Sequence, residues 1–171
     1  MRSKASNARN DGRAFEGQLE TIATQYVSKR IMRIKKCEQP LRIMGKRPFI
    51  KVVFMENPFL DFTGSWMERG GRMICFEAKS TTKPVLPIGG DNGMKQSQID
   101  AMGYWLAAGA VSFLLWECKG VVKFVTYAEI RHRLDRDKIK HLKFEQCMET
   151  VNQGMGFTFF DFAVNMRKHF V

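Results

Sequence analysis

The residues best suited to chemistry are Asp61 and those of the stretch FEAKS at 76–80. Side chains point alternately to the two faces of a β-strand, so Glu77 and Lys79 share one face of the strand predicted around them. The turn ERGGR at 68–72, whose paired glycines permit a tight reversal, separates this strand from one that starts near Asp61. The two carboxylates are therefore expected on neighbouring arms of a hairpin.

Two carboxylates at adjacent strand ends form a predicted site for a divalent metal. Mg²⁺ prefers oxygen ligands in octahedral geometry and keeps several of its waters. Such a metal can lower the pKa of a water and stabilise charge on a phosphodiester during hydrolysis. Lys79 could hold the attacking water or neutralise the charge on the phosphate. The simpler alternative is an exposed ion pair between Glu77 and Lys79 with no chemical role.

Composition favours one globular domain that binds an acidic partner. The chain has 171 residues, of which 44% are hydrophobic and 26% charged, and its formal net charge is +11. This size and apolar content suit a single core, and the charge favours nucleic acid ahead of a membrane surface. The four cysteines lack metal-knuckle spacing, so we expect reduced thiols and no zinc.

No segment is predicted to cross or target a membrane. The longest apolar run, WLAAGAVSFLLW at 105–116, has 12 residues, whereas a spanning helix needs ~20. The N-terminal stretch at 1–13 is basic and polar, which excludes a secretory signal. We therefore expect a cytoplasmic protein with a flexible basic arm at 1–11.

Positive charge concentrates in the segment 29–51, where Glu38 is the one acid. Its nine basic residues, predicted to bind DNA, are Lys29, Arg30, Arg33, Lys35, Lys36, Arg42, Lys46, Arg47 and Lys51. Bases alternate here with apolar residues, and two prolines exclude one uninterrupted helix. We interpret the segment as a protrusion that grips phosphates, with a solvated loop as the alternative.

The predicted elements form a mixed sheet with helices on its faces. Apolar residues at helical spacing predict a helix at 12–29, with the stripe Phe15, Leu19, Ile22, Ala23 and Tyr26. Further segments are predicted in chain order: strands at 49–55, 60–66 and about 72–80, a Gly/Pro-rich loop at 83–93, a helix at 95–108, a hairpin at 110–127, a charged helix at 128–138 and a short C-terminal helix.

The chain resembles the RecU family of Holliday junction resolvases, within the PD-(D/E)xK nuclease superfamily. The similarity is carried by motifs in a fixed order: GRAFE at 12–16, DFTG at 61–64, FEAKS at 76–80, LPI at 86–88 with QIDAM at 98–102, and GAVSFLLW at 109–116 with VVKFVTYAEI at 121–130. This resemblance implies a restriction-endonuclease-like α/β fold, with a single nuclease domain at 12–171 and a basic stalk at 29–51.

The resemblance also implies roles for individual residues. Asp61 and Glu77 would bind Mg²⁺, or Mn²⁺ in its place, with the Ala78 carbonyl as a further ligand. Glu16 would reach the metal directly or through water. Asp61, Glu77, Lys79 and Gln98 would form the catalytic set, in which Lys79 is the catalytic lysine and Gln98 positions water or a phosphate.

The implied substrate is branched DNA, a four-way junction that a homodimer would cut on two strands during recombination and repair. The enzyme would work in the cytoplasm near the nucleoid, and a phage or mobile-element origin fits the sequence. Two alternatives remain at this point. One is a different structure-specific or restriction-type nuclease of the same fold. The other is a non-catalytic DNA-binding module in which Glu77 and Lys79 merely pair.

Overall fold

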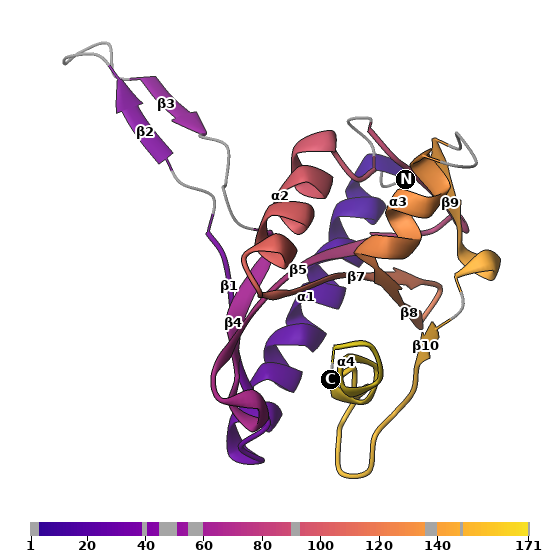
Figure 1. Ribbon diagram of the computed structural model, residues 1–171. Helices are drawn as coiled ribbons and strands as arrows, with labels where there is room; N and C mark the ends of the chain where they lie inside the picture. Colours follow the sequence, from indigo (N-terminus) through magenta and orange to yellow (C-terminus); the bar gives the residue numbers. More distant parts are fainter. Residues whose placement is uncertain are drawn as a thin grey trace.

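The computed structural model describes residues 4–38, 41–44, 51–54, 60–89, 93–135, 140–147 and 149–170. Its centre is a six-stranded sheet with the order β1-β4-β5-β7-β8-β10 (Figure 1). The strands are β1 (Met32–Lys36), β4 (Phe62–Trp66), β5 (Arg72–Thr81), β7 (Val111–Cys118), β8 (Val121–Thr126) and β10 (Glu149–Val151). Within this sheet β5 and β7 run parallel, and the other neighbours pair antiparallel. The predicted mixed sheet is therefore confirmed.

Helices cover both faces of the sheet. The helices are α1 (Lys4–Ser28), α2 (Gln96–Ala107), α3 (Tyr127–Asp135) and α4 (Ala163–His169), with short 3-10 turns η1 (Met67–Arg69) and η2 (Phe144–Gln146). One core cluster joins α1 and α4 to the sheet face that carries Phe76, and the other joins α2 and α3 to the face that carries Cys75. Helix α2 is the crossover that the parallel pair β5–β7 requires.

Helix α1 confirms the predicted apolar stripe but begins earlier than expected. Phe15, Leu19, Ile22 and Tyr26 are all buried in the core. The helix starts at Lys4 rather than Gly12, so the predicted flexible arm is helical backbone from Lys4 onward. Residues 4–11 contain no large apolar side chain. The sequence therefore shows no apolar stripe at helical spacing there, although the local composition permits a helix.

The basic segment 29–51 is divided between two structures, which corrects its predicted boundary. Strand β1 is the edge of the main sheet and pairs with β4 from Met32 opposite Trp66 to Lys36 opposite Phe62. A separate antiparallel ribbon follows, formed by β2 (Leu41–Met44) and β3 (Lys51–Phe54). Figure 1 draws this β2–β3 ribbon well apart from the main sheet.

A second small ribbon lies where the sequence indicated only a loop. Strand β6 (Val85–Pro87) pairs antiparallel with β9 (His141–Lys143). A three-residue strand next to prolines shows no clear alternation, and its partner lies far along the chain.

Within the described residues, no helix combines the length and apolar composition needed to cross a membrane.

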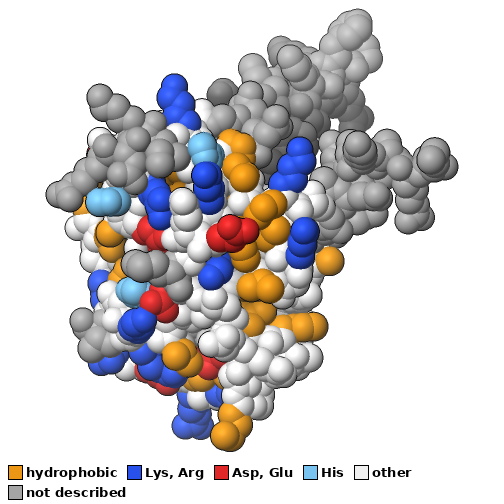
Figure 2. All heavy atoms as spheres, turned by 90° about the vertical axis from the view of Figure 1, so that its right-hand side faces the viewer, with side chains coloured by type: hydrophobic (Ala, Val, Ile, Leu, Met, Phe, Trp, Pro, Cys, Tyr) orange, Lys and Arg blue, Asp and Glu red, His pale blue; other side chains and the backbone are white. Residues whose placement is uncertain are grey.

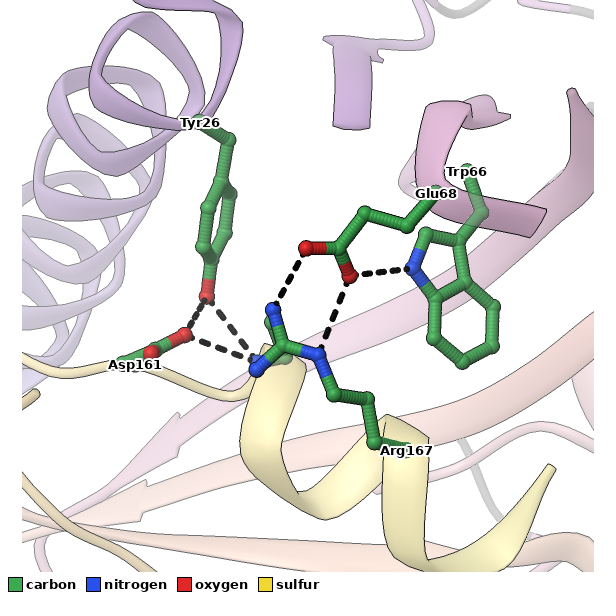
Figure 3. Close-up of polar contacts among 6 residues, drawn as sticks. Tyr26, Trp66, Glu68, Asp161 and Arg167 are labelled. Atoms are coloured by element: carbon green, nitrogen blue, oxygen red, sulfur yellow. Dashed lines mark hydrogen bonds and ion pairs between the residues drawn. The ribbon is translucent and has the colours of Figure 1, made fainter. Parts of the chain in front are cut away.

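Polar contacts fasten the C-terminal helix and the loop before it to the rest of the domain (Figure 3). The Tyr26 hydroxyl donates to Asp161 Oδ1 at 2.8 Å. The Arg167 guanidinium donates to both carboxylate oxygens of Glu68 at 2.9 and 3.0 Å, and Trp66 Nε1 donates to the same carboxylate at 3.3 Å. These bonds tie α4 and its preceding loop to α1 and η1.

Candidate active site

Asp61 and Glu77 lie side by side on one face of the sheet. Asp61 immediately precedes β4, and Glu77 lies in β5. Phe62 pairs with Phe76 across these antiparallel strands. Asp61 precedes Phe62 and Glu77 follows Phe76, so these two residues lie opposite each other on the other face of the sheet. The Ala78 amide donates to Asp61 Oδ2 at 3.2 Å, and the Asp61 amide lies 3.4 Å from Glu77 Oε2. Each carboxylate is thus held by the backbone of the other strand.

Glu77 is a fully buried acid. Its exposed fraction is 0%. Burial, and after it the negative charge of Asp61, holds the pKa of Glu77 well above its ordinary value, and Lys79 opposes that shift. A buried carboxylate next to a second one is unfavourable unless a cation compensates both. This electrostatic demand is what a divalent cation would meet.

The donor set suits a divalent cation that takes few protein ligands. No three His, Cys, Asp or Glu residues in the described part of the chain gather closely enough to hold a metal. Among the described residues, Asp61 and Glu77 supply two neighbouring carboxylates. Mg²⁺ is commonly bound through one or two carboxylates and keeps several waters. The pair fits such an ion, with substrate and water filling the remaining positions.

Lys79 adds a positive charge on the same face. Its Nζ lies 2.5 Å from Glu77 Oε1, and its side chain is 24% exposed. Lys79 lies two positions after Glu77 along β5, so both point to the same side, as the sequence predicted. The ammonium group thus lies between the buried carboxylate and solvent, where a phosphate would approach.

Gln98 connects helix α2 to the buried carboxylate. Its Oε1 accepts a hydrogen bond from the Lys95 amide at 2.9 Å, and its Nε2 donates to Glu77 Oε1. The side chain therefore caps the start of α2 and orients Glu77 at the same time. The resemblance implied that Gln98 handles water or phosphate, whereas its contact here is with the carboxylate.

Glu16 lies at the same end of the sheet but is engaged elsewhere. Its Oε2 forms an ion pair with Lys36 Nζ at 2.7 Å. Lys36 follows the buried Met32 and Ile34 by strand alternation and so faces α1. The hydrogen bond that Lys36 donates to Glu16 raises the pKa of Lys36, and the charge of Asp61 adds to the same shift. Glu16 as a metal ligand remains a prediction.

The predicted DNA-binding residues are not gathered in one place. Lys29 and Arg30 follow α1 at the end of β1 that is remote from Asp61, and Lys29 Nζ lies 5.1 Å from the Phe157 ring centre. Arg33 and Lys35 are exposed on β1. Arg42 and Lys51 belong to the β2–β3 ribbon by their backbone, while Lys46 and Arg47 lie outside the described residues.

Two contacts near the site had no interpretation in the sequence. The Cys37 amide donates to the Asp61 carbonyl at 2.7 Å, and this bond fixes the start of β4 against β1. The Lys95 amide donates the hydrogen bond that the Gln98 side chain accepts. The spacing of Lys95 and Gln98 is that of a helix capping box, a pattern that could have indicated the second contact.

The structure is an α/β fold, a mixed sheet flanked by helices, with an acidic pair and a lysine on adjacent strands. The chain belongs to the RecU family, since the family model described as Recombination protein U matches residues 10–166. RecU proteins are Holliday junction resolvases. No curated protein matches the chain.

Among solved structures, the chain is similar to Hjc of Archaeoglobus fulgidus, a Holliday junction resolvase from an archaeal hyperthermophile. The TM-score is 0.42 and the sequence identity 13%, over 68% of this chain and 73% of that chain. The assignment therefore rests on the family match and on the site itself.

Proposed function

We propose that this chain is a metal-dependent endonuclease that resolves four-way DNA junctions in recombination and repair. The observation that carries the proposal is the buried Glu77 carboxylate, flanked by Asp61, Lys79 and Gln98 on one sheet face. A purely structural ion pair would not require a second carboxylate beside a fully buried one. Family membership supplies the substrate class.

Asp61 and Glu77 are the proposed ligands of Mg²⁺, for which Mn²⁺ can substitute, and the Ala78 carbonyl and Glu16 are candidates for completing the set. When bound, the metal lowers the pKa of a water and stabilises charge on the phosphate. Gln98 holds Glu77 in place from the start of α2. Glu16 is available to the site only when its ion pair with Lys36 opens.

Lys79 is the proposed catalytic lysine. In the described structure its Nζ is paired with Glu77 Oε1. The Lys79 ammonium group would donate to a phosphate oxygen and offset the charge that develops there. Its partial exposure provides the access that this role needs.

A homodimer is the proposed active form, because a four-way junction has two strands to cut. An isologous dimer would place two copies of the site across a two-fold axis. The β2–β3 ribbon, apart from the sheet in Figure 1, is the proposed stalk that enters the junction. We place this activity in the cytoplasm, where such DNA is processed.

Cleavage of a synthetic four-way junction, a plain duplex and a single strand, each with and without Mg²⁺, tests the proposal. Glu77→Ala should abolish junction cleavage and leave junction binding intact, since the lost carboxylate would face phosphate. Glu38→Ala, which removes an exposed acid near β1, is the matched control and should cut normally. Equal loss of binding and cleavage in Glu77→Ala would sink the assignment.

A further inference from the structure

A group of exposed lysines lies on the β6–β9 ribbon and the start of α2. The described residues 82–89, 93–95 and 140–147 contain four lysines and one acid, Glu145. The lysines are Lys83, Lys95, Lys140 and Lys143, and all are exposed. Among the residues that the structure describes, none of the four forms an ion pair, whereas cations such as Lys168 and Arg167 do.

The β6–β9 ribbon presents a fixed outer face. Leu86 and Leu142 pair across it and point inward, each 1% exposed. Side chains alternate along a strand, so Val85 and its partner Lys143 point outward. The ribbon is anchored by buried leucines rather than by its own short ladder. Its lysines are therefore displayed on a rigid support.

Hydrogen bonds at the two ends of the β6–β9 ribbon place the other lysines. The Phe144 amide donates to the Pro84 carbonyl at 3.0 Å, which brings Lys83 and Lys143 to one end. The Ile88 amide donates to the Lys140 carbonyl at 2.9 Å at the other end. Lysines near both ends of one ribbon carry like charges, which repel one another modestly in water. An anion that spans the ribbon would relieve this repulsion.

The β6–β9 ribbon is connected to the buried carboxylate through a short chain of bonds. The Met94 amide donates to the Pro87 carbonyl at 2.9 Å. The amide of the next residue, Lys95, donates a hydrogen bond to Gln98 Oε1, and Gln98 Nε2 donates one to Glu77 Oε1. The ribbon, the start of α2 and the catalytic strand are thus held in one arrangement. Whatever binds the ribbon is positioned relative to Glu77.

We infer that the β6–β9 ribbon and the start of α2 bind the phosphate backbone of the duplex arm that is cut at Glu77. This inference rests on the proposed function. Duplex DNA carries about one negative charge per 1.7 Å of its axis, so a row of lysines suits it. The positive end of the α2 dipole adds to the attraction.

This surface is separate from the proposed stalk. Figure 1 shows β9 and the β2–β3 ribbon on opposite sides of α2. Figure 2 looks onto the β9 side of the molecule, where Lys and Arg side chains are spread over both the upper and the lower half of the view. An arm on the β6–β9 ribbon would leave the stalk free for the junction centre.

Binding of a plain duplex at several salt concentrations, without divalent metal, tests the inference. Lys83→Ala with Lys143→Ala should weaken binding and reduce the slope of log K against log salt by ~1.8, at ~0.9 for each lost phosphate contact. Arg69→Ala with Lys168→Ala removes the same charge near η1 and in α4, and should leave the slope unchanged. An unchanged slope in the first variant overturns the inference.

Lysine acetylation of the wild-type protein is a second test of the inference, and it does not require that a variant folds correctly. Duplex should protect Lys83, Lys95, Lys140 and Lys143 from the reagent and leave Lys168 reactive. Equal labelling with and without duplex overturns the inference. If junction cleavage is absent but this protection is seen, the proposed function fails and the binding surface stands. If cleavage is normal and protection is absent, the inferred binding surface fails and the proposed function stands.

Discussion

Gln98 donates a hydrogen bond from its side-chain amide to Glu77 Oε1 while its own carbonyl accepts from the Lys95 amide. One side chain therefore links the start of α2 to a carboxylate that is buried in the sheet. The orientation of Glu77 depends on this helix end, and we expect the proposed metal binding by Glu77 to depend on it too.

Gln98→Ala should raise the Mg²⁺ concentration needed for half-maximal cleavage. Loss of a partner that orients a metal ligand typically costs about 10–100-fold in metal affinity or activity. A metal titration of junction cleavage measures the effect. Gln96→Ala, which removes an exposed glutamine bonded to Asp100 on the same helix, should behave as wild type. A normal titration for Gln98→Ala would show that its contact with Glu77 has no role in metal binding.

Lys35 and Lys36 are neighbours with different expected effects on DNA binding. Lys35 is exposed, whereas Lys36 faces α1 and pairs with Glu16. Lys35→Ala should lower the slope of log K against log salt by ~0.9, as expected for one phosphate contact. Lys36→Ala should leave the slope nearly unchanged. Equal slopes for the two variants would mean that strand alternation does not decide which lysine meets DNA.

Tyr26→Phe should destabilise the fold without affecting the site. The change leaves the buried Asp161 carboxylate with one hydrogen bond fewer. Removing one partner of a buried polar group costs about 1–3 kcal/mol. Denaturant unfolding measures the loss, and junction cleavage at low temperature should remain normal. Tyr104→Phe, at a tyrosine that is 68% exposed, is the control, and equal stability of the two variants would contradict the expectation.

The Glu68–Arg167 pair predicts a pH-dependent contribution to stability. The hydrogen bond from Arg167 keeps the pKa of Glu68 below its ordinary value of 4.5, with burial opposing it. A lowered carboxyl pKa stabilises the fold above the ordinary value, and this contribution is lost as pH falls below it. Glu68→Gln should therefore lower stability at pH 7, by no more than about 1 kcal/mol, and have little effect at pH 3.

Thermal melting of Glu68→Gln and wild type between these pH values measures that difference. Glu145→Gln, at an exposed acid with no ion pair among the described residues, should melt like wild type throughout. A constant difference between Glu68→Gln and wild type across the range would rule out the ionic origin of the effect.

Sequence reasoning succeeded where a rule acts over a few residues. Alternation along one strand put Glu77 and Lys79 on the same face, and the glycine turn brought Asp61 alongside. The same alternation, continued from Met32 and Ile34, turns Lys36 inward. The total charge of the segment does not distinguish Lys36 from the exposed Lys35.

Contacts between distant parts of the chain were beyond reach of the sequence. Pairing of Val85 with Lys143 depends on how the whole sheet places β6 and β9. The partner of Gln98 likewise depends on the packing of α2 against β5. The family resemblance gave a role for Gln98 but not the atom that it contacts.

Mapping of cleavage positions on a four-way junction tests the central claim most directly. Each strand is labelled in turn, and the intact protein acts in Mg²⁺ on the junction and on a duplex of the same sequence. The proposed dimer, with one Asp61 and Glu77 pair on each side of its axis, predicts paired nicks at symmetric positions on two opposing strands and slower cutting of the duplex. Junction and duplex cut at equal rates, or cleavage that persists when the metal is removed, would contradict it.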